Sequence, residues 1–145
     1  MKWNDYFMGL ARYVASKSKD PTTKVGSVAV GPDHEVRETG YNGLPRGVQD
    51  LPERMVRPEK YLWTEHSEAN LVASAARPRL KGTTVYVTHL CCNGCARLLV
   101  SSGVSKVVMA DEPTSMPPEL HETALAILKE AGVVVEYYSP TESKQ

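Results

Sequence analysis

Two short motifs carry the side chains that most constrain the fold of this chain. His66-x-Glu68 opens an apolar run that predicts a helix, and Cys92-x-x-Cys95 follows a strand-like run. One imidazole and two thiolates suit zinc, and three protein ligands leave the fourth tetrahedral position for water, as in catalytic zinc sites. The fold is therefore expected to bring the starts of two helices together around one ion.

The spacing within each motif predicts the role of each residue. Cys92 and Cys95 share one face at the start of a helix, where free backbone N–H groups and the helix dipole favour thiolates. His66 and Glu68 would not share a face in a regular helix, so we expect them at its irregular first turn. We predict His66, Cys92 and Cys95 as zinc ligands and Glu68 as the proton carrier.

Two other interpretations of these cysteines remain open at this point. A Cys-x-x-Cys pair can act in redox chemistry, although His66 and Glu68 upstream argue against that role here. A purely structural zinc would need a fourth protein ligand, which His89 or Cys91 could supply. Such a closed site would carry out no chemistry.

Length, charge and cysteine content limit the class of protein. A chain of 145 residues is long enough for one domain with a sizeable core, which we expect over residues 1–138. It has 17 basic and 17 acidic residues, so no overall field attracts nucleic acid or a membrane, and small substrates are favoured. Three clustered cysteines, no signal peptide and no membrane-length apolar run predict a reduced, cytoplasmic protein.

The order of predicted elements indicates an α/β fold. A hairpin followed by strand and helix units predicts a mixed sheet of about five strands with helices on both faces. The proline-containing segment 44–65 has no clean period, which suggests a functional or mobile loop, or a disordered insertion. His34 and His121 have polar neighbours and are expected to face solvent. Helices are predicted over 5–16, 69–76, 92–102 and 117–132, strands over 26–30, 35–39, 83–88, 104–110 and 133–137, and a polar tail over 139–145.

The motifs resemble those of a known enzyme family. H-x-E followed by P-C-x-x-C is the signature of zinc nucleobase deaminases, and this chain departs from it only in having Cys91 in place of the proline. That change removes a fixed φ but no ligand. Segments 20–26 and 40–47 are similar to those of deoxycytidylate (dCMP) deaminases, cellular and phage, and the similarity runs from about residue 3 to residue 137. The resemblance implies a cytidine-deaminase-like three-layer α/β/α sandwich.

The resemblance also implies an activity. Members of this family hydrolyse dCMP to dUMP and ammonia, which supplies dUMP for thymidylate synthesis, with one Zn²⁺ per chain and a glutamate, here Glu68, that moves protons to N3 and the amino group. Asn42 would hold the sugar, unless it is only a turn residue that tolerates φ above zero. The backbone around Leu90 would accept a hydrogen bond from the leaving amine. Lys24 and Arg46 flank the family motifs and are candidates for binding the phosphate.

Regulation and assembly follow from the same resemblance. Family enzymes are commonly hexameric, activated by dCTP and inhibited by dTTP, and Mg²⁺ can accompany a triphosphate effector. The effector site would involve Gly40, Tyr41, Asn42 and Gly43. Residues 111–116 lack the aromatic side chain that some relatives place over the substrate.

Other activities are compatible with parts of this pattern. A deaminase of cytidine or dCTP would use the same zinc chemistry. A tRNA adenosine deaminase would be expected to show a basic face, and the balanced charge argues against one. A non-catalytic zinc protein that binds nucleotides would have no need of Glu68.

Overall fold

One mixed sheet organises the structure, a computed structural model that describes residues 1–141. Strand β1 (Gly26–Val30) pairs antiparallel with β2 (Val36–Tyr41) and β3 (Thr84–Val87), whereas β3, β4 (Lys106–Met109) and β5 (Val134–Tyr137) run parallel. The sequence-based prediction of five strands in a mixed sheet is therefore confirmed. In sheet order the strands are β2, β1, β3, β4 and β5, so β3 is the central strand.

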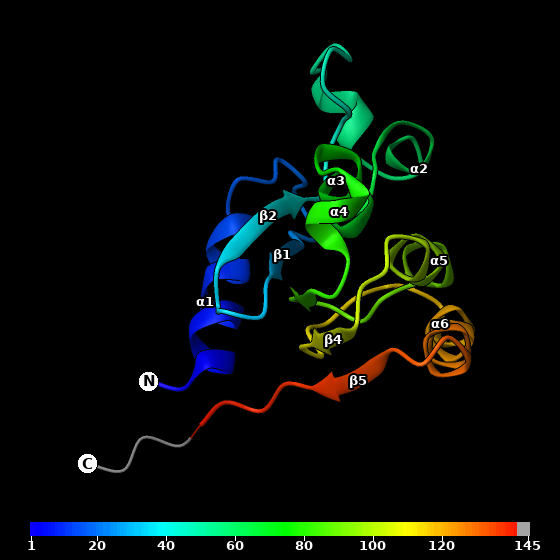
Figure 1. Cartoon of the computed structure of the whole chain (residues 1–145). Helices are drawn as coiled ribbons and strands as arrows, with labels where there is room; N and C mark the ends of the chain where they lie inside the picture. The colour runs from blue at the N-terminus through cyan, green and yellow to red at the C-terminus, as the bar shows by residue number, and fades with distance from the viewer. Residues whose placement is uncertain (142–145) are drawn as a thin grey trace.

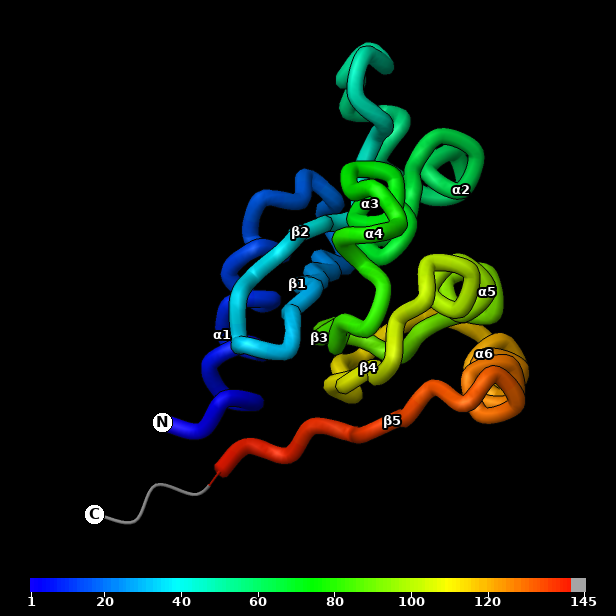
Figure 2. Tube along the Cα trace, viewed as in Figure 1, coloured from blue at the N-terminus to red at the C-terminus, as the bar shows by residue number. Residues whose placement is uncertain are grey.

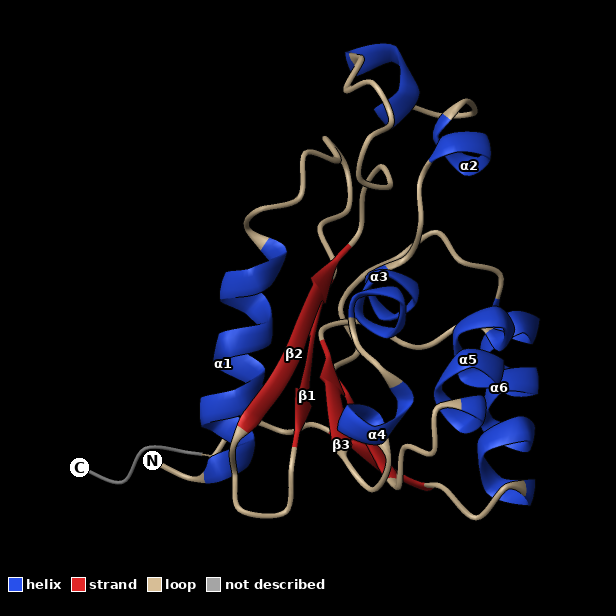
Figure 3. Cartoon of the chain, turned by 45° about the horizontal axis from the view of Figure 1, so that its top comes forward, coloured by secondary structure: helices blue, strands red, loops and turns tan. Residues whose placement is uncertain are grey.

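Helices cover both faces of this sheet and make three layers (Figure 1). Helix α1 (Trp3–Ala15) packs on one face against β1, β2 and β3. Helix α3 (Ser67–Ser74) packs on the opposite face, with α5 (Asn93–Ser101) beside it and α6 (Pro118–Glu130) against α5. Figure 3 shows α1 alone on its side of the sheet and the other three long helices across from it.

The two faces of the sheet build two clusters of buried side chains. Phe7 and Met8 of α1 pack against Val108, whereas Leu99 of α5 packs with Val107. Neighbouring strand residues point to opposite faces. A strand covered on both faces therefore reads as a continuous apolar run, as the sequence around β4 does.

A glycine permits the close contact between α1 and the sheet. A Cβ at Gly26 would collide with the backbone of Ala11 and Ala15 in α1. Gly40 has the same role on the other face, where a Cβ would collide with the backbone of Ser67. This second contact holds the start of α3 against β2 and so positions His66.

Segment 44–65 is an ordered excursion rather than a disordered insertion, so that alternative is wrong. A short β-bridge closes its base, because Gly43 and Glu65 exchange backbone hydrogen bonds of 3.1 and 2.9 Å. Between them lie a 3-10 turn (Pro52–Met55) and helix α2 (Lys60–Trp63). Figure 2 shows this part of the trace, cyan to green, leaving the end of the sheet and returning to it.

Several helix ends differ from the sequence-based prediction. Helix α3 ends at Ser74, whereas the sequence predicted an end at residue 76. A further short helix that was not predicted, α4 (Arg77–Leu80), has Pro78 in its first turn, where proline is tolerated. Residues 142–145 of the predicted polar tail lie outside the described residues. None of the helices within residues 1–141 is long and apolar enough to cross a membrane.

Candidate active site

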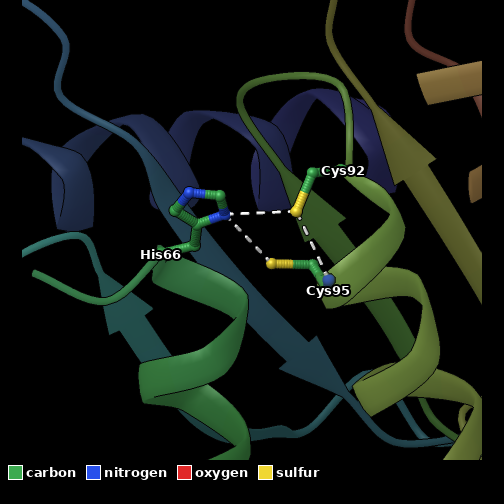
Figure 4. Close-up of side chains that lie close together, drawn as sticks. All are labelled: His66, Cys92 and Cys95. Atoms are coloured by element: carbon green, nitrogen blue, oxygen red, sulfur yellow. Dashed lines mark hydrogen bonds between the residues drawn. The ribbon is translucent and has the colours of Figure 1, made fainter. Parts of the chain in front are cut away.

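The predicted zinc ligands converge from the starts of two helices. His66 is the N-cap residue of α3, Cys92 is the N-cap residue of α5, and Cys95 lies in the first turn of α5. Their candidate ligand atoms all lie within 4.8 Å of one another. The His66 Nδ1 atom is 3.3 Å from Cys92 Sγ and 3.4 Å from Cys95 Sγ, and Figure 4 shows the three side chains pointing toward one another.

The protonation of these three groups fits a metal cation. Hydrogen bonds from the side chain of Cys95 and, after it, from His66 lower the pKa of Cys92 to about 3 against the effect of burial. The same bond to Cys92 raises the pKa of His66 to about 9, and the pKa of Cys95 is also raised. A thiolate is thus held between two groups that share protons with it. Zinc takes the place of such protons, because it binds thiolates and neutral imidazole.

No fourth protein ligand joins this group within residues 1–141. Cys91 is fully buried, and burial first, then the nearby charge of Glu68, raise the pKa of its thiol. His89 Nδ1 is hydrogen-bonded to Thr88 Oγ1 at 2.7 Å. The closed structural site considered from the sequence is therefore not formed, and the arrangement leaves a coordination position for water.

Glu68 lies beside the convergent group, in the first turn of α3. It is 3% exposed, and its Oε1 atom accepts a hydrogen bond of 2.6 Å from the hydroxyl of Ser67. Because His66 is an extended N-cap residue, it lies outside the regular helix, and both His66 and Glu68 line one cavity. This cavity of about 620 Å³, which we call the zinc cavity, is also lined by Asn42 and Leu90. Its size suits a small-molecule ligand.

Comparison with known proteins identifies this group of side chains. Residues 1–111 match the model of the cytidine and deoxycytidylate deaminase zinc-binding region. The chain belongs to this family. The matched range contains the His-x-Glu and Cys-x-x-Cys motifs, so the chain is a zinc-dependent hydrolytic enzyme of the deaminase class rather than a redox protein.

Individual relatives agree with the family assignment. The deoxycytidylate deaminase of Mus musculus is 32% identical over 150 residues, which cover 99% of this chain and 84% of the relative. That of Mycobacterium phage D29 is 36% identical over 123 residues, or 76% of this chain and 95% of the relative. The dCMP deaminase of cyanophage S-TIM5, solved in complex with dCMP and dUMP, superposes with a TM-score of 0.74 at 24% identity, over 95% of this chain and 99% of that chain. The cytidine-deaminase-like fold is thereby confirmed.

Asn42 of this deaminase is held by the neighbouring loop. Its Oδ1 atom accepts from Val25 N–H at 2.9 Å, and its Nδ2 atom donates to the Thr23 carbonyl at 2.9 Å. Asn42 is not among the residues with positive φ, so its interpretation as a turn residue of that kind is wrong. The amide keeps one N–H and one lone pair beyond these two bonds, and both are available at the cavity wall.

The two candidate phosphate ligands lie in different places. Lys24 lines a second cavity of about 340 Å³, which shares Thr23 and His89 with the zinc cavity. Arg46 lines a third cavity of about 530 Å³, together with the four candidate effector residues Gly40, Tyr41, Asn42 and Gly43. The structure thus groups Lys24 with the zinc site and Arg46 with the candidate effector loop.

Two cationic residues of the zinc cavity were not predicted from the sequence. Arg57 and Lys60, both from segment 44–65, line its wall. Lys60 Nζ is 2.9 Å from Asp20 Oδ2, and both side chains are buried. A buried lysine needs an acidic partner, but nothing local in the sequence indicates that this partner is Asp20.

His121 is the one histidine whose predicted setting is wrong. It is 9% exposed, and its ring is hydrogen-bonded to the Cys91 carbonyl at 3.0 Å and to the Tyr137 hydroxyl at 2.9 Å. His34 is exposed, as predicted, and stacks on Trp3. The polar sequence around His121 is misleading because only one side of α6 faces solvent, and His121 lies on the other.

Proposed function

We propose that this protein hydrolyses dCMP to dUMP and ammonia and so provides dUMP for thymidylate synthesis. The observation that carries the proposal is the group formed by His66, Cys92 and Cys95, with buried Glu68 beside it, in the wall of one cavity. The choice of dCMP is supported by curated relatives named deoxycytidylate deaminase, which align with almost the whole chain.

His66, Cys92 and Cys95 would hold the zinc ion. When bound, zinc supplies Lewis-acid activation of water at neutral pH. Glu68 takes a proton from the attacking water while the new C4–O bond forms, and it delivers this proton to N3 of the base. Glu68 then carries the remaining water proton, now on the hydroxyl at C4, to the amino group. The C4–N bond breaks, and ammonia leaves. The hydroxyl of Ser67 keeps the carboxylate oriented for these transfers.

The cavity wall provides contacts for the rest of the nucleotide. The carbonyl at Leu90 accepts a hydrogen bond from the departing amine, and the free N–H of Asn42 binds a sugar hydroxyl. Lys24 binds the 5′-phosphate, because its cavity adjoins the zinc cavity through Thr23 and His89. A lysine ammonium and adjacent threonine hydroxyls suit a phosphate group.

Regulation is assigned to the third cavity. Gly40, Tyr41, Asn42 and Gly43 form part of its wall, and Lys17, Lys19 and Arg46 supply positive charge. We propose that dCTP, with Mg²⁺, activates the enzyme here and that dTTP inhibits it. The protein acts as a homo-oligomer, a hexamer, as the family resemblance implies.

Parallel substrate assays test the activity. Ammonia release is measured from dCMP, cytidine, dCTP and an adenosine-containing RNA hairpin, with the Glu68→Ala variant as the control for contaminating deaminases. We expect dCMP to give the highest kcat/KM. A higher value for cytidine or dCTP would overturn the choice of substrate but keep the reaction, whereas activity only on the RNA would overturn the proposal.

A further inference from the structure

Side chains hold the part of the loop between β3 and α5 that surrounds Cys91. Cys91 is fully buried at its centre. Its backbone N–H donates to Met109 Sδ at 3.3 Å, and its carbonyl is 3.0 Å from His121 Nδ1. Buried backbone groups require such partners, and within residues 1–141 His121 is the partner of this carbonyl.

The two hydrogen bonds of His121 specify its tautomer. A carbonyl oxygen can only accept, so Nδ1 carries the proton and donates it to Cys91. In the neutral imidazole Nε2 has a free lone pair, and it accepts from the Tyr137 hydroxyl at 2.9 Å. Tyr137 in β5, His121 in α6 and Cys91 in the loop therefore form one directed chain of hydrogen bonds, which we call the His121 relay.

The loop held by the relay carries two functional neighbours. Leu90 precedes Cys91 and lines the zinc cavity, and Cys92 follows it as a member of the convergent group. Rotating the peptide carbonyl of Cys91 changes its ψ angle and the φ angle of Cys92, which displaces the Cys92 thiolate. Cys91 stands where the deaminase signature has proline, so no pyrrolidine ring fixes the φ angle of this residue, and its backbone N–H is free to donate to Met109 Sδ.

We propose that His121, oriented by Tyr137, is a positioning residue that holds the 90–92 loop in the geometry required for zinc binding. The inference rests on the proposed function, since it assumes a zinc ion at His66, Cys92 and Cys95. His121 is not among the residues that line the zinc cavity, so it acts through the loop and not on the substrate. Both His121 and Tyr137 lie beyond residues 1–111, the range that matches the zinc-binding family model.

Zinc release from the purified zinc-loaded protein tests the relay. An excess of a chromogenic chelator captures the released ion, and its colour reports the rate without any use of catalysis. His121→Phe keeps the volume of the ring but removes the donor, and we expect release to accelerate by roughly tenfold to a hundredfold, as for other residues that orient metal ligands. Tyr137→Phe changes release in the same direction by a smaller factor. His121→Asn retains an N–H donor and stays within about threefold of the parent.

Tyr138→Phe is the matched control. It removes the hydroxyl of the next residue along the chain, which donates to Asp5 Oδ1 at 2.7 Å and has no contact with the loop. We expect parental zinc release from this variant, even if its free energy of unfolding falls as much as that of Tyr137→Phe. Steady-state kinetics add a second readout: His121→Phe lowers kcat for dCMP, while KM stays near the parental value because the phosphate contacts are unchanged.

The relay is overturned if Tyr137→Phe and His121→Phe release zinc at the rate of Tyr138→Phe. If His121→Phe does not fold, the comparison between the two tyrosine variants decides alone. NMR of the ring nitrogens of His121 is a further test. A proton on Nε2 instead of Nδ1 in the parent protein would contradict the His121 relay. A parent protein that binds no zinc would overturn the proposed function and the relay together, whereas zinc binding with unaffected release overturns only the relay.

Discussion

The carboxylate of Glu68 is buried in the first turn of α3, and one of its oxygens accepts a hydrogen bond from the Ser67 hydroxyl. This setting places an ionisable group at the wall of the cavity where a nucleobase would react. A group so placed can transfer protons to a substrate without large movements. Substitutions of single side chains in this site should therefore have clear effects on activity or metal content.

Glu68→Ala is expected to keep the fold and the zinc ion while losing deamination. General acid–base catalysis contributes roughly a hundredfold to ten-thousandfold, and here one group serves several proton transfers. Ammonia release and elemental analysis of the same preparation measure both properties. Activity within about tenfold of the parent would contradict the role of Glu68.

The two adjacent cysteines are expected to respond oppositely to replacement by serine. Cys92→Ser removes a thiolate whose pKa is about 3, and zinc should be lost. Cys91→Ser replaces a fully buried thiol whose raised pKa keeps it protonated, and zinc should be retained. Metal content per chain decides between them. The reverse pattern would mean that the ligand assignment is displaced by one residue.

Lys24→Ala is expected to raise KM for dCMP by roughly tenfold or more, because hydrogen bonds to charged groups contribute about 1.5–3 kcal/mol. Its effect on cytidine, which has no phosphate, should be small. Arg46→Ala is the matched control and should leave KM for dCMP near the parental value, since Arg46 lines a different cavity. An equal loss with dCMP and cytidine would show that Lys24 supports the fold and does not bind the phosphate.

At the scale of elements, one buried ion pair joins helix α2 to the loop before β1. Asp20 Oδ1 accepts from the backbone N–H groups of Thr22 and Thr23, and its Oδ2 accepts from Lys60. Thr23 in turn accepts from the side chain of Asn42. Segment 44–65 is thereby attached to the loop that supports the candidate sugar ligand.

Lys60→Met is expected to destabilise the fold by about 3–5 kcal/mol, because it leaves Asp20 buried without its partner. Urea unfolding measures this change. Lys19→Met breaks the exposed pair between Lys19 and Asp50 and should have little effect. Similar losses in both variants would mean that burial does not determine the strength of the Asp20 pair.

The same pair should give stability a defined pH dependence. Burial raises the pKa of Asp20, but hydrogen bonds from Thr23, Thr22 and Lys60 outweigh it and bring the pKa below its ordinary value of 3.8. The stabilisation is therefore present above that value and is lost as the pH falls through the pKa of the folded state. The difference in unfolding free energy between the parent and Lys60→Met should narrow on acidification to about pH 3. A difference that stays constant down to that pH would contradict the assignment.

At the scale of the whole molecule, the zinc cavity and the third cavity lie close enough to share Asn42. A ligand in one can influence the other only by binding two states of the molecule with different affinity. The bridge between Gly43 and Glu65 links the base of segment 44–65 to the residue before His66. This connection provides a physical route between the two cavities.

Accordingly, dCTP and dTTP are expected to act oppositely on dCMP turnover at subsaturating substrate. Gly43→Ala should weaken both responses more than it weakens catalysis in the activated state, because Gly43 lines the third cavity. The fold should stay intact, since a Cβ at Gly43 meets nothing within 4 Å. Rate curves against dCMP with each triphosphate and with neither measure the effect, and light scattering on the same samples tests the hexamer. Superimposable curves would mean that the enzyme deaminates dCMP but is not regulated by dCTP or dTTP.

Features of this protein that depend on residues near one another in the chain could be predicted before the fold was known. The three-residue spacing of Cys92 and Cys95, the N-terminal position of His66 and Glu68, and the runs that form the five strands are local patterns, and the structure reproduces them. Helix starts and strand periods follow from backbone geometry over a few residues. That is why the convergent group and the fold class could be predicted without coordinates.

Contacts between segments far apart in the chain could be identified only in the folded molecule. Lys60 pairs with Asp20 across 40 residues, His121 reaches the Cys91 carbonyl across 30, and Lys24 and Arg46 separate into different cavities. The two hydrogen-bonded pairings leave no periodic signal, because each satisfies a buried polar group whose partner is determined by the packing of whole elements. His121 shows the physical reason most clearly: its neighbours in sequence are polar, yet the docking of α6 against α5 turns its ring toward the zinc-site loop.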